Sequence, residues 1–213
     1  MANLKDLTVD GFVQITSSEE PAPGGGSVSA LAGALAAALA EMVARLTVGR
    51  ERYAAAEEEM QQVLREAGAI KEELVAAIQK DSSSFEQYMA ALALPKNTEE
   101  EKAARREAMQ EGLKAAAQVP LGVARSAARI LPLAQAAVAR GNGNAVTDAL
   151  VAAMMARTAV LGALFNVKIN LSSIRDEAFV QELSREAAAL EQAALEGEQA
   201  ILRSTEIGAS CCR

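Results

Sequence analysis

The chain of 213 residues contains no histidine and no tryptophan. Histidine is the commonest general base near neutral pH and a frequent metal ligand, so its absence excludes serine–histidine triads and the usual zinc sites. Any acid–base chemistry must use Asp, Glu, Lys, Tyr or Cys side chains. We therefore expect no bound metal and look for a carboxylate that could transfer protons.

Aromatic residues make up only 3% of the chain, although 51% of its residues are hydrophobic. The apolar residues are mainly Ala, Leu and Val, which favours closely packed helices over a sheet built on aromatic and β-branched residues. The two cysteines, Cys211 and Cys212, are adjacent near the end of the sequence and cannot join distant elements through a disulfide. This cysteine usage indicates a reducing, cytoplasmic location.

The charge pattern lacks the basic patch typical of a nucleic-acid-binding protein. The net charge is -7, and Lys and Arg are scattered among a larger number of acids. The N-terminal residues MANLKDLTVD lack the apolar core of a signal peptide. The longest charge-free run, between Glu20 and Glu41, has too few large apolar residues to span a bilayer. We expect a soluble protein with no nucleic-acid or membrane partner.

Apolar residues recur every three or four positions along most of the chain, which is the period of an α-helix. This period and the turn signals between segments predict helices over residues 3–16, 27–48, 52–92, 98–118, 120–140, 147–168 and from about 178 to 206. We predict an all-α fold, an up-and-down bundle of five or six long helices packed antiparallel or orthogonally. Residues 1–213 form one domain, with a disordered or frayed tail from about residue 207.

Asp81 is the main candidate for chemistry. It follows Ile78 by three residues and precedes Phe85 by four, so it lies in the apolar stripe of its helix. A desolvated carboxylate there would have a raised pKa, as a general acid or base near neutral pH requires. Alternatively, Asp81 or Ser83 caps a restarted helix, and Glu86 completes a capping box on Ser83. The periodicity leaves both interpretations open.

The segment PAPGGGSVSALAGALA is a glycine-rich loop that leads into a helix. Backbone amides at a helix N-terminus can bind an anion or the polar edge of a heterocycle. No GK[ST] follows and no strand precedes the loop, so it is neither a P-loop nor a dinucleotide-binding fingerprint. The alternative is a tight turn that permits close helix packing.

Several other polar residues in apolar helices have two interpretations. Asp148 is either a ligand contact or an acid in the first turn of a helix, where the helix dipole favours it. Asn166 and Asn170 share one helix face and are either ligand contacts or hydrogen bonds between helices. Arg45 and Arg157 could each pair with a buried acid or bind a substrate carboxylate.

Together these segments resemble the formimidoyltetrahydrofolate cyclodeaminase family, which includes stand-alone methenyltetrahydrofolate cyclohydrolases. The similar stretches are PAPGGGSVSALAGALAAALAEMVARLTVGR, KDSSSFEQYMAALALPKNTEEEKAAR, VPLGVA, GNGNAVTDALVAA and FNVKINLSSIRDEAF. They occur in this order over residues 21 to about 179. The combination of PAPGGGS, LPKNTEEEK and NVKIN is specific.

The resemblance implies an all-helical fold, a homodimer and a site for a tetrahydrofolate derivative. Asp81 lies where the family places its catalytic acid, and the glycine-rich loop would lie beside the pterin ring. The residues that would bind the substrate are Gly24, Gly25, Gly26, Ser27, Asp148, Asn166 and Asn170. The folate is the substrate, and no cofactor is expected.

The reaction expected from the resemblance converts 5-formimidoyltetrahydrofolate to 5,10-methenyltetrahydrofolate and releases ammonia. The alternative is the cyclohydrolase reaction, in which 5,10-methenyltetrahydrofolate and water give 10-formyltetrahydrofolate. The chain contains no segment resembling the formiminotransferase domain of bifunctional relatives. A more remote alternative is a non-catalytic helical scaffold that dimerises through its Gly- and Ala-rich helix.

Overall fold

The computed structural model describes residues 3–210, which form helices and connecting turns without a β-strand. The elements are η1 (Leu4–Asp6), α1 (Val9–Thr16), α2 (Gly25–Arg45), η2 (Glu51–Ala56), α3 (Glu57–Leu92), α4 (Glu99–Ala128), α5 (Ile130–Arg140), η3 (Gly143–Ala145), α6 (Val146–Leu171), α7 (Glu177–Arg203) and α8 (Glu206–Ser210). The predicted all-α bundle is confirmed. Short helix α8 occupies part of the predicted frayed tail, and Cys211 and Cys212 lie outside the described residues.

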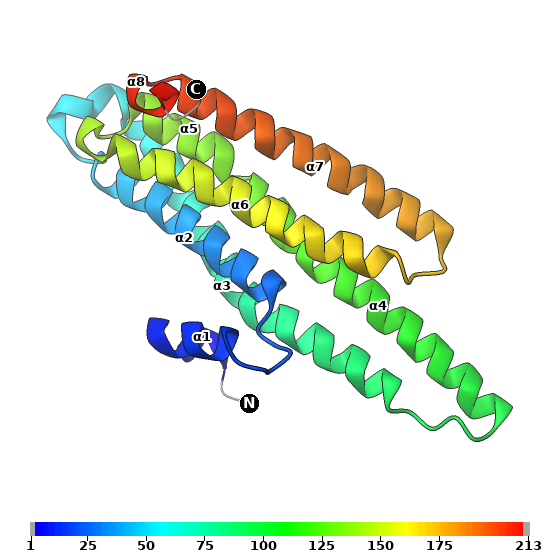
Figure 1. Cartoon of the computed structure of the whole chain (residues 1–213). Helices are drawn as coiled ribbons and strands as arrows, with labels where there is room; N and C mark the ends of the chain where they lie inside the picture. The colour runs from blue at the N-terminus through cyan, green and yellow to red at the C-terminus, as the bar shows by residue number, and fades with distance from the viewer. Residues whose placement is uncertain (1–2, 211–213) are drawn as a thin grey trace.

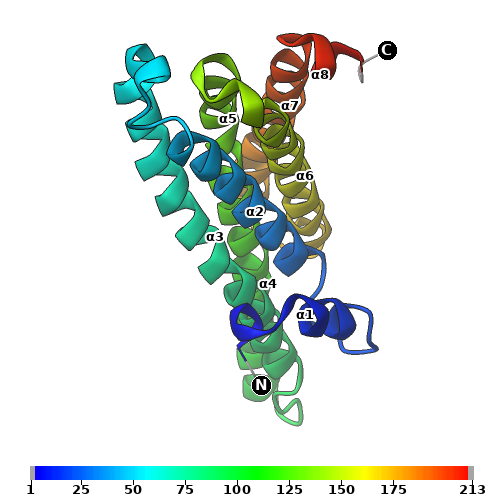
Figure 2. The same cartoon turned by 90° about the vertical axis from the view of Figure 1, so that its left-hand side faces the viewer.

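The long helices run antiparallel along one axis (Figure 1). Helix α2 packs between α3 and α6, α4 lies behind them against the same two neighbours, and α7 packs on α6. Helix α1 lies across the bundle axis near the start of α2 (Figure 2). The N-terminal segment that leads into the central helix α2 therefore lies outside the bundle of long helices.

Small residues let the central helices approach closely. A Cβ added at Gly33 of α2 would lie 3.0 Å from Leu74 Cδ1 of α3 and 3.3 Å from Ala159 Cβ of α6. By length and composition alone, α2 and the segment Gly143–Leu171 could cross a membrane. In the bundle, 61% and 50% of their most apolar windows are buried, so half or more of this apolar surface packs against other helices.

Helix α4 is longer than predicted because Pro120 does not end it. The helix continues through Pro120 to Ala128 and breaks at Arg129, where α5 begins. Proline lacks an N–H group, so Pro120 leaves the carbonyl of Ala116, four residues earlier, without its helical donor. The side-chain amide of Asn170 on α6 donates to that carbonyl at 3.0 Å. A hydrogen bond between helices thus replaces the one that proline removes.

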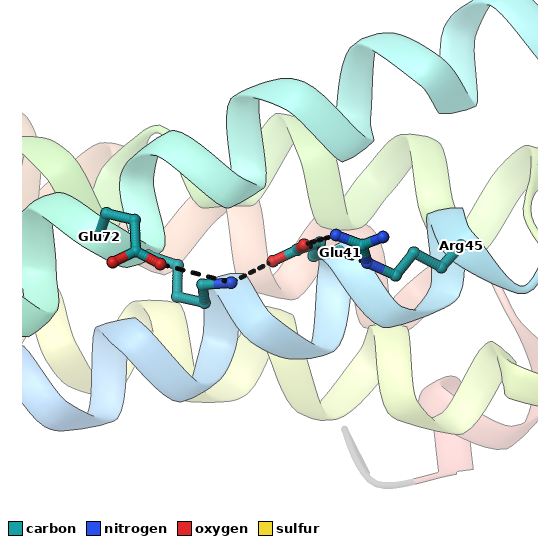
Figure 3. Close-up of polar contacts among 4 residues, drawn as sticks. Glu41, Arg45 and Glu72 are labelled. Carbon is teal, nitrogen blue, oxygen red and sulfur yellow. Dashed lines mark hydrogen bonds and ion pairs between the residues drawn. The ribbon is translucent and has the colours of Figure 1, made fainter.

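A buried carboxylate fixes α2 against α3. Glu41 of α2 accepts hydrogen bonds from Lys71 Nζ of α3 at 2.8 Å and from Arg45 Nε at 3.1 Å, and Figure 3 shows Arg45 and Glu72 on opposite sides of Glu41. The hydrogen bond from Lys71 lowers the pKa of Glu41, although burial opposes this. Arg45 therefore pairs with a buried acid. Arg157 does the same, donating to Glu198 Oε2 at 2.8 Å between α6 and α7.

Replacing Lys71 with Met is expected to destabilise the bundle, because it leaves Glu41 buried with one cation instead of two. A lost hydrogen bond to a buried charge costs about 1–3 kcal/mol in the free energy of unfolding. Glu72→Gln removes an exposed partner of the same lysine and is the matched control. Denaturant unfolding of the two variants measures the difference, and equal stabilities would contradict a structural role for Lys71.

Candidate functional site

A cavity of about 300 Å³ opens where α2 begins, between the glycine-rich loop, α3 and α6. Six of the predicted catalytic or substrate-binding residues line this cavity: Gly24, Gly25, Gly26, Asp81, Asn166 and Asn170. They come from segments separated by up to 146 residues, from Gly24 to Asn170. The fold therefore brings the glycine-rich loop and the candidate carboxylate into one site.

Asp81 contacts the first turn of α2 directly. Its Oδ2 accepts a hydrogen bond from Ser27 Oγ at 3.0 Å. A Cβ added at Gly26 would overlap the carboxylate and lie 2.5 Å from its Cγ. Only glycine at position 26 leaves room for Asp81, so the two sequence features form a single structural unit.

Helix α3 runs without interruption through residues 81–86, so the prediction that Asp81 or Ser83 caps a restarted helix is wrong. Asp81 lies within α3, but its carboxylate faces the N-terminal end of a different helix, α2. The N-cap residue there, Gly24, has no side chain to bind the free amides. A carboxylate at the positive end of the α2 dipole takes that role from another helix.

The environment of Asp81 favours its protonated form. Burial raises the pKa of this carboxyl group above its ordinary value of 3.8, and hydrogen bonds from the hydroxyl and backbone N–H of Ser27 only partly offset the effect. A raised pKa brings a carboxyl group closer to the pH at which it can both take up and release a proton in a reaction. Asp81 therefore has the properties of a general acid–base residue.

The hydroxyl of Ser27 can adapt to either protonation state of Asp81. It lies 3.0 Å from Asp81 Oδ2 and 2.9 Å from the backbone carbonyl of Ile78. When Asp81 is ionised, Ser27 can donate its single proton to the carboxylate. When Asp81 is protonated, Ser27 can accept from it and donate to Ile78 instead. The carboxyl group can thus change its protonation state and keep a hydrogen-bond partner.

The two asparagines of α6 use their amide groups differently. Asn170 Nδ2 donates both to Ala116 O of α4 and, at 2.8 Å, to Asn166 O. Asn170 therefore forms a hydrogen bond between helices, which is one of the two alternatives predicted for it. Asn166 Nδ2 donates only to Gly162 O in its own helix, at 2.9 Å. The side-chain oxygens of both residues remain the groups that can accept a hydrogen bond from a ligand.

These contacts predict that one alanine variant mainly loses stability and that the other mainly loses ligand affinity. Asn170→Ala leaves the Ala116 carbonyl unpaired and should lower the free energy of unfolding by about 1–3 kcal/mol. Asn166→Ala removes only a bond within one helix turn, so it should change ligand affinity more than stability. Unfolding curves and ligand titrations of both variants make the comparison. Equal stability losses would show that Asn170 has no special structural role.

Asp148 does not line this cavity, so the structure does not bring it together with the other predicted residues. It lies in the first turn of α6, whereas Asn166 lies 18 residues further along the same helix. At a rise of about 1.5 Å per residue, the two are about 27 Å apart along the helix axis. Within this chain, the position of Asp148 fits the alternative of an acid favoured by the helix dipole.

Two aromatic residues of the cavity, Phe85 and Tyr88, were not predicted as site residues. They follow Asp81 by four and seven positions, which places all three on one face of α3. This spacing could have indicated that Phe85 and Tyr88 belong to the site, although apolar residues at helical spacing occur equally often in a core. Ile169 also lines the cavity while its side chain is 70% exposed.

Comparison with known proteins identifies the relatives of this chain. Residues 8–189 match the model of the formiminotransferase-cyclodeaminase family. The methenyltetrahydrofolate cyclohydrolase of Methylorubrum extorquens is 38% identical over 183 residues, which cover 86% of this chain and 88% of that protein. The formimidoyltransferase-cyclodeaminase of Mus musculus is 36% identical over 96% of this chain, which spans only 38% of the mouse protein.

A solved structure has the same fold. The crystal structure of formiminotetrahydrofolate cyclodeaminase from Thermotoga maritima superimposes with a TM-score of 0.84 at 30% sequence identity. The match covers 94% of this chain and 96% of the Thermotoga chain. The bundle is therefore the complete fold of that relative.

Proposed function

This chain belongs to the formiminotransferase-cyclodeaminase family, and we propose that it converts 5-formimidoyltetrahydrofolate to 5,10-methenyltetrahydrofolate and ammonia in the Asp81 cavity. The observation that carries the proposal is a partly buried carboxyl group with a raised pKa, set against a helix N-terminus inside a cavity. The chain has no histidine to supply this chemistry. We propose further that the reaction needs no cofactor apart from the folate itself.

The proposed reaction needs one proton to move between two nitrogens. The formimino group on nitrogen 5 enters in its protonated, cationic form, and nitrogen 10 of the folate attacks its carbon and must lose its own proton. Asp81 accepts that proton as the tetrahedral amino intermediate forms. The same carboxyl group then returns the proton to the amino group, which leaves as ammonia. Atoms balance, and Asp81 ends in the state in which it began.

The ionised carboxylate also suits the product. The methenyl bridge between nitrogens 5 and 10 carries a positive charge, which an adjacent carboxylate stabilises. Ser27 holds the carboxylate in place through its hydroxyl group. Asp81 would thus act twice, as the proton carrier and as the counter-charge.

A second candidate is the cyclohydrolase reaction, favoured by the match to the Methylorubrum cyclohydrolase, which covers 86% of this chain and 88% of that protein. Here water adds to the methenyl carbon, Asp81 accepts a proton from the water, and the hydroxyl intermediate opens to 10-formyltetrahydrofolate. The two reactions use the same carbon and the same carboxyl group. They differ in whether nitrogen or oxygen occupies the fourth position on that carbon.

An absorbance assay of the methenyl chromophore distinguishes the candidates. With 5-formimidoyltetrahydrofolate, the cyclodeaminase reaction should produce the chromophore together with one equivalent of ammonia. With 5,10-methenyltetrahydrofolate, the cyclohydrolase reaction should accelerate its disappearance above the rate without protein. No acceleration with either substrate would overturn the proposed function. Tetrahydrofolate should also raise the melting temperature, because a ligand that binds only the folded state stabilises it.

We also propose that the protein is a homodimer that pairs through an apolar face on α2 and α6. This face, the α2/α6 stripe, consists of exposed residues that recur on the outer side of two adjacent helices: Val28, Leu35, Leu46, Val151, Met154, Phe165 and Ile169. Phe165 and Ile169 are 66% and 70% exposed. Large apolar side chains exposed on neighbouring helices are characteristic of protein interfaces.

Phe165→Glu is expected to dissociate the dimer, because burying a carboxylate in an apolar interface is costly. Sedimentation should shift from twice the chain mass to 22.2 kDa. Val13→Glu, which changes an exposed apolar residue outside the stripe, is the matched control. A wild-type protein that sediments as a monomer at micromolar concentration would contradict the proposal.

A further inference from the structure

A second cavity, of about 280 Å³, lies beside the Asp81 cavity. Its apolar wall comes from the N-terminal segment, through Leu4, Leu7 and Ile15. Ala22 and Ser82 line both cavities, so the two adjoin along the loop that precedes α2. The proposed reaction uses no residue of this second cavity.

The polar groups of the two cavities differ. The Asp81 cavity holds the side-chain oxygens of Asn166 and Asn170 and the free amides of the first turn of α2. The second cavity is lined mainly by leucine, isoleucine and alanine side chains, and of its three polar residues, Glu20, Gln79 and Ser82, Gln79 already accepts the backbone N–H of Leu4 through Oε1 at 2.9 Å. A ligand group rich in donors and acceptors would find few partners there, at a cost in binding free energy.

A tetrahydrofolate has two unlike parts on either side of the reacting carbon. The pterin ring carries several hydrogen-bond donors and acceptors, whereas the aromatic ring attached to nitrogen 10 presents two apolar faces. We propose that this aromatic ring binds in the second cavity, against Leu7 and Ile15, while the pterin ring binds in the Asp81 cavity. This inference rests on the proposed function and assigns a substrate-binding role to the N-terminal segment.

The charge of Glu20 and the packing of the N-terminal segment on the bundle both agree with binding of the aromatic ring in the second cavity. Glu20 also lines the second cavity and would repel the carboxylates at the far end of the substrate, so only the neutral ring enters. Leu4 and Phe12 are buried and anchor the segment to the bundle, whereas Val9, the first residue of α1, is 85% exposed. In Figure 2, α1 crosses the bundle axis beside the first turn of α2, as a wall of this cavity must.

The test compares two ligands on the full chain. Tetrahydrofolate contains both rings, whereas 6-methyltetrahydropterin contains only the first. Leu7→Asn and Ile15→Asn should each weaken tetrahydrofolate binding by about tenfold, the factor expected for losing one good apolar contact. Neither variant should change the Kd of 6-methyltetrahydropterin. In the assay, KM should rise while kcat at saturation is retained.

Val13→Asn changes an exposed residue of the same helix and should leave both ligands unaffected. Circular dichroism and melting temperature confirm that each variant is folded, and the two cavity variants test the same wall independently. Equal weakening of both ligands, or none, in the folded variants would overturn the inference while leaving the proposed function intact. A wild-type protein that binds neither ligand would overturn both.

Discussion

Replacing Asp81 with Asn is expected to reduce turnover by about a hundredfold to ten-thousandfold, the usual effect of removing a general acid–base group. The amide has nearly the same shape and can still accept a hydrogen bond from Ser27, but it cannot carry a proton. The loss should appear in kcat more than in the affinity for tetrahydrofolate. Steady-state kinetics with the methenyl chromophore measures both.

The same variant should be at least as stable as the wild-type protein at neutral pH. The folded-state pKa of Asp81 lies above its ordinary value of 3.8, so an ionised Asp81 destabilises the folded state. Wild-type stability should therefore fall as the pH rises from about 3.8 through the folded-state pKa. The advantage of Asp81→Asn should grow over that interval and disappear below it. Melting temperatures of both proteins across this range give the comparison.

Glu86→Gln is the matched control, since Glu86 is an exposed acid on the same helix five residues away. It should keep both turnover and melting temperature. If Asp81→Asn also kept near-normal turnover, Asp81 would serve only to cap α2, and another group would have to transfer the proton.

Replacing Gly26 with Ala should impair the enzyme nearly as severely, although alanine adds only one methyl group. That methyl group would occupy the space of the Asp81 carboxylate, so Asp81 must move. Displacing a catalytic group by about 1 Å can cost about a hundredfold in rate. Gly122→Ala is the matched control, because a Cβ at Gly122 of α4 meets open space.

A double variant separates this effect from a general loss of folding. If Gly26 acts through Asp81, Gly26→Ala combined with Asp81→Asn should have nearly the same turnover as Asp81→Asn alone. Multiplicative losses in the double variant would show that Gly26 affects the reaction by another route. Circular dichroism of the three variants should show the same helix content.

The sequence predicted the helices well because their apolar periods are long and their ends carry recognisable signals. Thr98, where the predicted helix 98–118 begins, is an example, since it caps α4 through a capping box with Glu101. Pro120 is the counter-example. Its effect depended on Asn170, fifty residues away, which supplies the missing hydrogen bond. Local sequence could not show that compensation.

The candidate site was predictable in its parts but not in its geometry. Asp81 and the glycine-rich loop could each be identified from their own segments. Their mutual contact, in which the carboxylate fills the space beside Gly26, exists only after α2 and α3 have packed. Asp148 is a polar residue of an apolar helix that lies far from this cavity along α6, so its predicted contact with the substrate stays a prediction. Spacing within one helix assigns a face, but neighbouring helices decide which part of that face meets the site.

The buried Glu41–Lys71 contact has a consequence for how the protein can move. Sliding α3 past α2 by one helical turn, about 5.4 Å, would break this contact as well as the one between Asp81 and Ser27. Helices α2 and α3 are thus held together by polar contacts at two positions along their length, and we expect them to move as one rigid body. Opening of the site to admit a substrate must then come from parts outside this pair, such as the N-terminal segment, which lines the neighbouring cavity through Leu4, Leu7 and Ile15.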